Sequence, residues 1–333
     1  MKEVKKITIA IPARNEEKFI GHCLDSLLLQ THPKELTEII IVDGASTDHT
    51  KQVALEYAKR YPFIRVLDNP KKYTPYSMNI GVKNATGDAV TIGGAHSTYE
   101  KDYLEKCVRY LNEYPDAANV GGGIRTTPAR DTLTAKGIVA ALSSFFGAGN
   151  SLFRTGITEP TWADTVFGGC FRKELFEEVG YFNEHLTRSQ DMEFNIRLKK
   201  AEKKILLVPD IVSIYHPKAT FWSFFVHNLK DGIWAILPMK YGARMFKLRH
   251  LLPFFFVAGL IGSLLLSLLV PFFIYFFYIG LGLWILAALY FSVKISLREK
   301  TIVLLPFIFI AFAVRHFGYG LGSIVGFIRL ATG

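Results

Sequence analysis

Chemistry-bearing residues stand where three apolar runs of the N-terminal half end. The run ITIAIP leads into Arg14 and Glu16, EIIIVD ends on Asp43, and AVTIGG leads into His96. A carboxylate such as Asp43 can accept a hydrogen bond from the imide N–H of a nucleotide base. An imidazole such as His96 can ligate Mn²⁺ or Zn²⁺, or donate a hydrogen bond to a phosphate. These strand ends are therefore candidate ligand-binding positions.

A second chemical centre is predicted in RSQDMEFNIRLKK, where Asp191 stands at the start of a helical pattern. A positioned carboxylate can remove a proton from an attacking hydroxyl group. A helix N-terminus would lower the pKa of Asp191, and helix capping is the alternative role. Glu193 faces elsewhere on the helix and is a candidate for orienting an acceptor. Asp164 and the small residues around Gly169 precede this helix and would let an acceptor approach.

The elements that must position these residues alternate between apolar strands and helical patterns three times within the first ninety or so residues. Such alternation predicts a parallel sheet with crossover helices, in which ligands bind at the carboxyl ends of the strands. The first strand is not followed by GxGxxG, and the chain has no Walker A sequence. Dinucleotide-binding and P-loop functions therefore lose their main support.

The C-terminal part is predicted to enter a membrane. No charged residue occurs from Leu251 to Val293, and only Arg315 and Arg329 carry a fixed charge after Thr301. These lengths fit spans at about 251–270, 272–293 and 301–328, with a turn near Pro271. The alternative is a set of buried helices in a soluble domain.

Basic segments flank the predicted spans, which places them on the cytoplasmic side. The N-terminus lacks an export signal, so the first 240 residues are expected in the cytoplasm of an integral protein of the cell (inner) membrane. The net charge of +10 is concentrated beside the membrane, so membrane lipids are a better explanation than nucleic acid. The three cysteines have no metal-binding spacing and are expected to be free thiols.

Four motifs occur in order along the first 200 residues, and they are IPARNEE, IIIVDGASTDHT, NIGVKNATGDAVTIGGAH and GYFNEHLTRSQDMEFNIRLKK. They resemble the motifs of family 2 glycosyltransferases, which have a nucleotide-binding GT-A fold. The membrane tail contains WSFFVHNLKDGIWAILPMKYG and RHFGYGLGSIVGF, and it is similar to that of succinoglycan-type exopolysaccharide glucosyltransferases. The resemblance implies an α/β fold with a Rossmann-like mixed sheet in residues 1–217, followed by an amphipathic interfacial region at 218–249 and a transmembrane domain at 250–333.

The resemblance implies a UDP-sugar donor and assigns residues to it. Asp43 would bind the base, usually uracil, and Lys72 the diphosphate, although a solvated pair of lysines is the alternative for Lys71 and Lys72. Asp191 would be the general base of an inverting displacement. The loop formed by Pro12, Arg14 and Glu16 would contact the nucleoside.

The donor site departs from the family at Gly94-Ala95-His96, where the family carries Asp-X-Asp to hold Mg²⁺ or Mn²⁺. His96 is then the candidate metal ligand and diphosphate contact, with His216 as a second partner. One imidazole does not make a good Mg²⁺ site. We therefore expect that Mn²⁺ helps more than Mg²⁺, or that removal of divalent cations has little effect.

On the acceptor side, Trp234 stands in HNLKDGIW, where processive synthases carry Gln-X-X-Arg-Trp, so transfer of one sugar is favoured. Arg315 and His316 lie within the third apolar segment, and Arg315 would contact a lipid pyrophosphate or snorkel to the interface. The expected function is transfer of a hexose to a polyprenyl-linked saccharide in exopolysaccharide or cell-surface glycan synthesis. Alternatives are transfer to polyprenyl phosphate itself and a non-catalytic scaffold.

Overall fold

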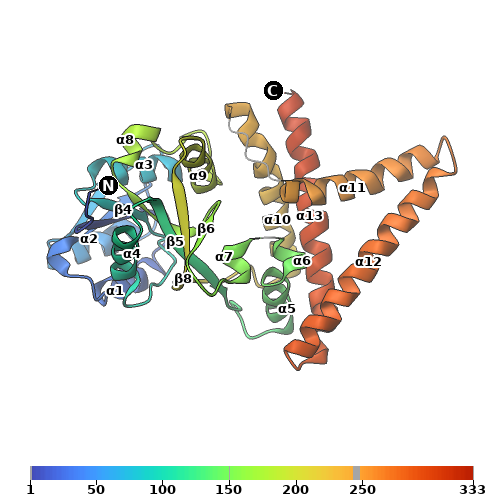
Figure 1. Cartoon of the computed structure of the whole chain (residues 1–333), viewed down its shortest axis with the longest axis horizontal. Coiled ribbons are helices and arrows are strands. Elements are labelled where there is room, and N and C mark those ends of the chain that lie inside the picture. The colour runs from blue at the N-terminus through green and yellow to red at the C-terminus, as the bar shows by residue number, and fades with distance from the viewer. Residues whose placement is uncertain (1, 150, 243–247, 333) are drawn as a thin grey trace. The chain divides into compact units, whose positions relative to one another are not determined.

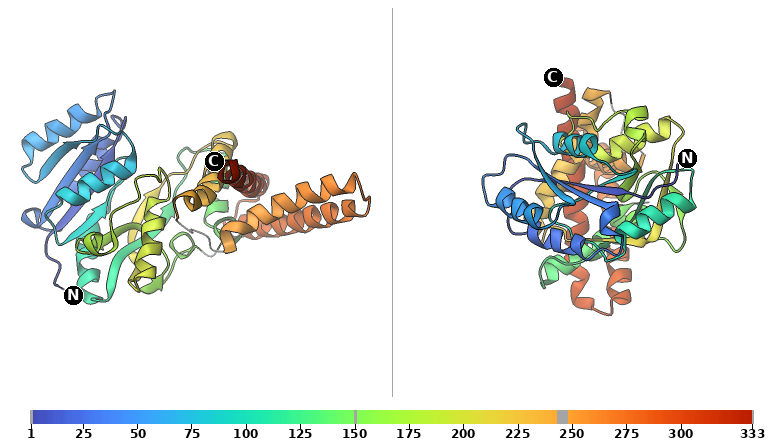
Figure 2. Two further views of the ribbon diagram at one scale, coloured as in Figure 1. Left: turned by 90° about the horizontal axis from the view of Figure 1, so that it is seen from above. Right: turned by 90° about the vertical axis from the view of Figure 1, so that its left-hand side faces the viewer.

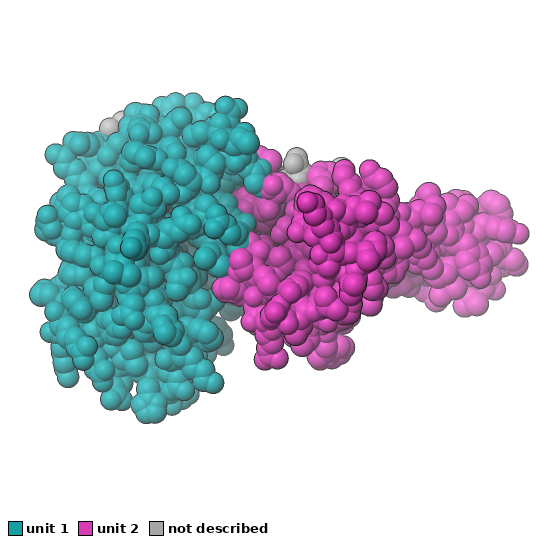
Figure 3. Space-filling view, turned by 90° about the horizontal axis from the view of Figure 1, so that it is seen from below, with its two compact units in different colours: residues 1–125, 156–215 teal, residues 126–155, 216–333 magenta. Residues whose placement is uncertain are grey.

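The chain forms two compact units (Figure 3). The structure, a computed structural model, describes residues 2–149, 151–242 and 248–332, with only the backbone for Leu248 and Arg249. Unit 1 consists of residues 1–125 and 156–215, and unit 2 consists of residues 126–155 and 216–333. Each unit is described separately below.

Unit 1 is built on an eight-stranded mixed sheet, which confirms the predicted α/β fold (Figure 1). The strand order is β3-β2-β1-β4-β7-β5-β8-β6, with parallel pairing among β1 to β4 and antiparallel pairing of β7 with both β4 and β5. β5 ends at Thr126, the first residue of unit 2. The strands are β1 (Ile7–Ala13), β2 (Thr37–Asp43), β3 (Ile64–Asp68), β4 (Ala89–Ile92), β5 (Ala117–Thr126), β6 (Thr161–Ala163), β7 (Phe167–Arg172) and β8 (Lys204–Tyr215).

Helices cover both faces of this sheet because the strand side chains alternate between the two faces. Ile9, Ile11 and Ile39 pack against α1 and α2, whereas Ala10 and Ile40 pack with α3, α8 and α9. The helices of unit 1 are α1 (Ile20–Leu28), the 3₁₀ turn η1 (Lys34–Leu36), α2 (Thr50–Arg60), α3 (Thr74–Asn84), α4 (Tyr103–Glu113), α8 (Leu175–Val179) and α9 (Gln190–Lys200).

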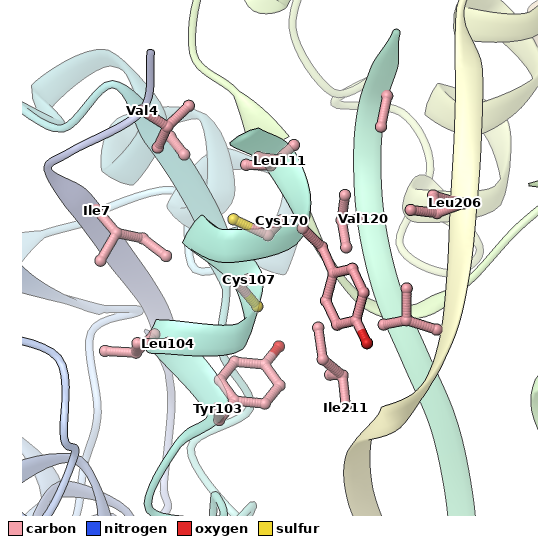
Figure 4. Packing of buried hydrophobic residues seen from close by; sticks show 14 residues of the cluster. Val4, Ile7, Tyr103, Leu104, Cys107, Leu111, Val120, Cys170, Leu206 and Ile211 are labelled. Carbon is pink, nitrogen blue, oxygen red and sulfur yellow. The ribbon is translucent and has the colours of Figure 1, made fainter. Parts of the chain in front are cut away.

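The cysteines belong to this apolar interior. Cys107 on α4 and Cys170 on β7 lie among Leu104, Leu111 and Val120 (Figure 4). All three cysteines are free, as predicted, and the structure shows that they are also buried. They contribute to packing, since buried thiols behave as small apolar groups.

Unit 2 is helical, and three of its helices are long and apolar enough to cross a membrane. The predicted turn near Pro271 is confirmed between α11 and α12. The third predicted span begins with a 3₁₀ turn and continues as a helix to Thr332. The elements are α5 (Leu133–Leu142), α6 (Phe145–Ala148), α7 (Leu152–Thr155), α10 (Phe221–Ile236), η2 (Leu237–Tyr241), α11 (Leu248–Ser267), α12 (Phe273–Arg298), η3 (Ile302–Leu304) and α13 (Leu305–Thr332).

Residues 126–155 pack with the C-terminal helices, which the sequence did not predict. A side chain at Gly137 of α5 would meet the Phe307 backbone and Cβ within 3.0 Å, so α5 lies directly against α13. The predicted interfacial region contains α10 and η2, and the basic residues Arg244 and Lys247 lie outside the described residues. The division at residues 217 and 249 stays a prediction.

Candidate functional site

A cavity of about 500 Å³ opens in unit 1 where the carboxyl ends of β1, β2 and β4 meet the start of the antiparallel strand β7. This volume is within the range of sites for small molecules and cofactors. Eight of the residues predicted for the site line it. They are Pro12, Arg14, Glu16, Lys72, Gly94, His96, Gly169 and Asp191.

The loops after β1 and β2 are tied together beside the cavity. Asn15, in left-handed conformation, donates its backbone N–H to Ser46 Oγ at 3.1 Å and accepts from Thr47 N–H through Oδ1 at 2.9 Å. The Glu16 N–H donates to Thr50 Oγ1 at 2.7 Å. These bonds hold Arg14 and Glu16 at the cavity wall, as predicted from their position after the strand.

Asp43 ends β2 and is buried, and among the described residues only one of its two carboxylate oxygens has a hydrogen-bond partner. Its Oδ2 accepts from the Ser46 N–H at 3.1 Å, whereas Oδ1 has no hydrogen-bond partner among the described residues. Gly44, the next residue, lines the cavity. A buried acceptor without a partner is costly, which is the expected state of a group that receives a ligand donor.

The stretch after β4 forms a tight turn beneath His96. The Gly94 N–H donates to the Tyr99 hydroxyl at 2.8 Å, and the Ser97 N–H donates to the Gly94 carbonyl at 3.0 Å. A side chain at position 94 would begin 2.6 Å from Ser97 Oγ, so an acid there would need the Ser97 hydroxyl to move. This turn is the local reason that glycine is well suited to the position.

His96 is exposed and has a carboxylate neighbour that the sequence did not indicate. Its Nδ1 lies 3.5 Å from Glu16 Oε1, so the loop after β1 and the turn after β4 bring an imidazole and a carboxylate together. Protonation of His96 would make this an ion pair. Lys72, in left-handed conformation with φ 69°, also lines the cavity and brings an ammonium group to it.

The first turn of α9 brings Asp191 to the cavity. The N-cap of α9 is Ser189, which has φ 61° and makes no side-chain capping bond. Asp191 lies within the first turn of the helix and is therefore not its N-cap. The carboxylate is in contact with the open cavity. Nevertheless, the surrounding protein desolvates it and raises its pKa, against the lowering effect of the Met192 and Asp191 N–H groups. The predicted lowering of this pKa by the helix N-terminus is therefore wrong, because desolvation has the larger effect.

Two glycines of β7, Gly168 and Gly169, line the cavity beside the buried amides of Asn119 and Asn195. An added Cβ at Gly169 would lie 2.5 Å from Asn119 Oδ1, and Asn119 Nδ2 donates to Asn195 Oδ1 at 2.9 Å. Asn195 in turn donates to Thr165 Oγ1 at 3.0 Å. A larger side chain at position 169 would therefore displace Asn119, and the role of these small residues toward an acceptor stays a prediction.

Two predicted acceptor residues are engaged elsewhere. Glu193 is buried and accepts two bonds from Arg197, at 2.7 and 2.9 Å, while Arg197 also donates to the Val179 and Tyr181 carbonyls. Asp164 accepts from Lys199 Nζ. Neither carboxylate lines the cavity, so the structure gives Glu193 a role in holding α9 and gives Asp164 a surface ion pair.

The other two predicted partners belong to unit 2. His216 Nδ1 lies 3.0 Å from Thr127 Oγ1, and Trp234 lies on α10. Their roles toward diphosphate and acceptor stay predictions. Asn79 of α3 fixes the loop before α9, because its side chain donates to the Phe182 carbonyl and accepts from the Phe182 N–H, both at 2.9 Å.

Within the described ranges, no group of three or more His, Cys, Asp or Glu side chains is arranged to hold a metal ion. The His96–Glu16 pair offers one nitrogen and one oxygen, which is too few ligands for the six-oxygen shell that Mg²⁺ prefers. These residues do not form a resident Mg²⁺ site.

Sequence reasoning missed several lining residues. Asn195 follows Asp191 by four positions and so shares its helix face, a spacing that could have revealed it. Tyr99 and Ser213 carried no sequence signal, because an isolated bridge between them joins segments far apart in the chain.

Comparison with known proteins gives consistent similarities. The family model described as Glycosyl transferase family 2 matches residues 8–180. A Methanococcus voltae protein is 32% identical over 330 residues, covering 96% of this chain and 98% of that protein. Its name is dolichyl N-acetyl-alpha-D-glucosaminyl phosphate 3-beta-D-2,3-diacetamido-2,3-dideoxy-beta-D-glucuronosyltransferase.

Succinoglycan biosynthesis protein ExoA of Rhizobium meliloti (strain 1021) is 29% identical over 252 residues, covering 69% of this chain and 74% of that protein. Among solved structures, mannosyltransferase PcManGT from Pyrobaculum calidifontis, in complex with GDP-Man and Mn²⁺, superimposes with a TM-score of 0.58 at 18% identity. That match covers 93% of this chain and 86% of the other, and it confirms the GT-A-like fold.

Proposed function

The chain belongs to glycosyltransferase family 2, and we propose that it is an inverting enzyme that moves a hexose from a UDP-sugar to a polyprenyl-linked saccharide. The observation that carries this proposal is the shared cavity of unit 1. Asp191, at the start of α9, lines it together with Arg14 and His96 from the strand ends and Lys72 from the loop after β3. A general base and a group of cations for a diphosphate therefore face the same volume.

The donor is proposed to bind along the edge of β1, β2 and β4. The unpartnered Asp43 Oδ1 suits the imide N–H of uracil, because a carboxylate is an acceptor only. Cytosine has no such N–H, so the contact favours uridine. Arg14 and Lys72 supply positive charge for the diphosphate, and the His96 imidazole can donate a hydrogen bond to it.

In the chemical step, Asp191 takes the proton from the acceptor hydroxyl as its oxygen attacks the anomeric carbon. The bond from that carbon to the UDP oxygen breaks, and UDP leaves with the electron pair on the opposite side. One displacement inverts the configuration at the anomeric carbon. A raised pKa suits this role, because a base is most effective when its pKa approaches the working pH.

Divalent cations are proposed to be dispensable. Since the His96–Glu16 pair does not make a Mg²⁺ site, the charge of the leaving diphosphate is offset by Arg14 and Lys72, with His96 as a hydrogen-bond donor. PcManGT was solved with Mn²⁺. Binding of Mn²⁺ through His96 is therefore the alternative, and adding Mn²⁺ to the transfer assay tests it.

The acceptor is proposed to be a sugar already attached to a polyprenyl lipid. The M. voltae relative is named for a dolichyl phosphate that already carries N-acetylglucosamine. The three apolar helices indicate membrane association, which suits a lipid-linked acceptor. The proposed place is the cytoplasmic face of the cell (inner) membrane, in exopolysaccharide or cell-surface glycan synthesis.

The test is a product assay with the purified full chain and a panel of UDP-hexoses. One arm offers a polyprenyl-linked saccharide, and the other offers bare polyprenyl phosphate. We expect label to enter the saccharide-bearing lipid. Label on bare phosphate alone would favour the alternative acceptor, and UDP binding without any transfer would favour a scaffold.

A further inference from the structure

The helix α13 has two faces with different neighbours. Arg315, Gly322 and Gly326 lie on one face, about 160–200° around the helix from Pro306. An added Cβ at Gly322 would lie 2.1 Å from the Leu229 carbonyl, and one at Gly326 would lie 2.8 Å from Ile236. α10 therefore runs along this face, in the same direction as α13.

Arg315 extends from this same face to polar groups. It donates to the Gly147 carbonyl, which lies in α6, and to Asn228 Oδ1 of α10 at 3.1 Å. Asn228 is fully buried. The segment 144–149 and α10 are therefore fastened to the middle of α13, and neither predicted role for Arg315, lipid pyrophosphate contact or snorkelling, is needed to explain its place.

The opposite face of α13 is apolar and is exposed toward both ends of the helix. Pro306, Ile310 and Ile328 are exposed and lie within about 40° of one another around the helix, spaced along most of its length. The hairpin of α11 and α12 contacts α13 near this stripe. Phe317 packs on Phe256 and Trp284, with ring centroids 5.4 Å apart in both pairs.

The hairpin leaves α13 rather than running along it. In the left view of Figure 2, α13 is seen end-on while α11 and α12 extend away from it side by side. The hairpin turn is fully apolar and open, with Leu268 and Leu269 80% and 81% exposed. No charge occurs from Leu251 to Val293, so the hairpin is suited to the hydrocarbon interior.

A transmembrane orientation of α13 would place polar groups at the wrong depth. The helix has 28 residues, about 42 Å, and its middle contacts Leu229 and Asn228. The next two residues of α10 are Lys230 and Asp231, and Asp231 Oδ2 lies 3.3 Å from His227 Nε2. These charges, and the non-helical backbone at Ser143–Ser144 and Gly149, would then lie near the bilayer centre. Both features are strongly disfavoured there.

We propose that α13 lies along the membrane surface, with the Pro306–Ile310–Ile328 stripe toward the lipid and α10 and α6 on the aqueous side. The α11–α12 hairpin is then the one element that enters the bilayer. The C-terminal end of α13 returns to the side from which α11 entered, which is the side of the catalytic unit. The inference rests on membrane association and not on the proposed reaction, so its test does not depend on activity.

The test is cysteine labelling of the full chain in sealed vesicles with a membrane-impermeant maleimide. Ala331→Cys reports the end of α13, and Lys59→Cys on α2 reports the catalytic unit; both positions are exposed. The unsubstituted chain is the control, because its three cysteines are buried. We expect both variants to be labelled from the same side. Labelling of Ala331→Cys only from the other side would overturn the proposal.

Depth measurements with spin labels provide a second readout that does not depend on sidedness. Labels at Ile310, Leu321 and Ile328 should report one common depth if α13 lies in the surface. In a crossing helix, Leu321 would lie about 9 Å deeper than Ile310, since it is nearer the middle of α13. That depth difference would overturn the proposal.

Discussion

Replacing Asp191 by asparagine should separate activity from stability. The substitution keeps the shape of the side chain but removes the base. General base catalysis typically contributes 10²- to 10⁴-fold, so we expect kcat to fall by about that factor, or about 3–5 kcal/mol of transition-state stabilisation. The carboxylate faces the open cavity, so its replacement leaves the neighbouring helix contacts in place.

The same variant should be at least as stable as the parent chain. Folding raises the pKa of Asp191, so ionisation of this group opposes folding. The penalty is absent below the unfolded pKa of about 3.9 and grows as the pH rises toward the folded pKa. At neutral pH, asparagine removes this penalty. Thermal unfolding should therefore show an unchanged or higher melting temperature.

The assay is UDP release with the purified full chain, measured against pH. In the parent chain the rate should rise as Asp191 loses its proton, above the ordinary range of an aspartate, and this limb should vanish in Asp191→Asn. Asp116→Asn is the matched control, because Asp116 is an exposed partner of Lys204. If both variants keep rates within about threefold of the parent, Asp191 is not the base.

Three further predictions concern the remaining parts of the site. Asp43→Asn should weaken UDP binding about 10- to 100-fold, the worth of a hydrogen bond to a charged group, and reduce the preference for UDP over CDP in calorimetry; an unchanged preference would exclude Asp43 as the base contact. EDTA should lower transfer less than about threefold, and added Mn²⁺ should help more than Mg²⁺. If transfer strictly required Mg²⁺ and was lost in His96→Ala, further oxygen ligands would have to complete a Mg²⁺ site at His96. Glu193→Gln should lower the free energy of unfolding by about 2 kcal/mol or more, because Arg197 loses a buried partner, while the remaining folded enzyme keeps its KM; a large change in KM alone would return Glu193 to the acceptor site.

The sequence predicted the site wherever a residue directly follows a strand or begins a helix. His96 was placed at the cavity and Asp43 beside it in this way, because the carboxyl ends of parallel strands meet at one edge. The pairing of Glu193 with Arg197 was not predicted, since its helix position gave no sign of the bonds from Arg197 to two distant carbonyls. The contact between Glu16 and His96 likewise depends on two loops that only the folded sheet brings together.

In the membrane part, charge-free length predicted three apolar helices but not their arrangement. Hydropathy depends on composition, whereas the environment of α13 depends on which segments pack against it. The packing of Gly137 on Phe307, and of Gly147 near Arg315, places residues 126–155 with the C-terminal helices. No local pattern in that segment indicates such a long-range partner.

The configuration of the new glycosidic bond tests the central claim most directly. Nuclear magnetic resonance of the product made by the purified chain from an α-linked UDP-hexose gives the anomeric form. A single displacement assisted by Asp191 predicts a β-linked product. An α-linked product would require a second displacement or a front-side path, and would contradict the mechanism.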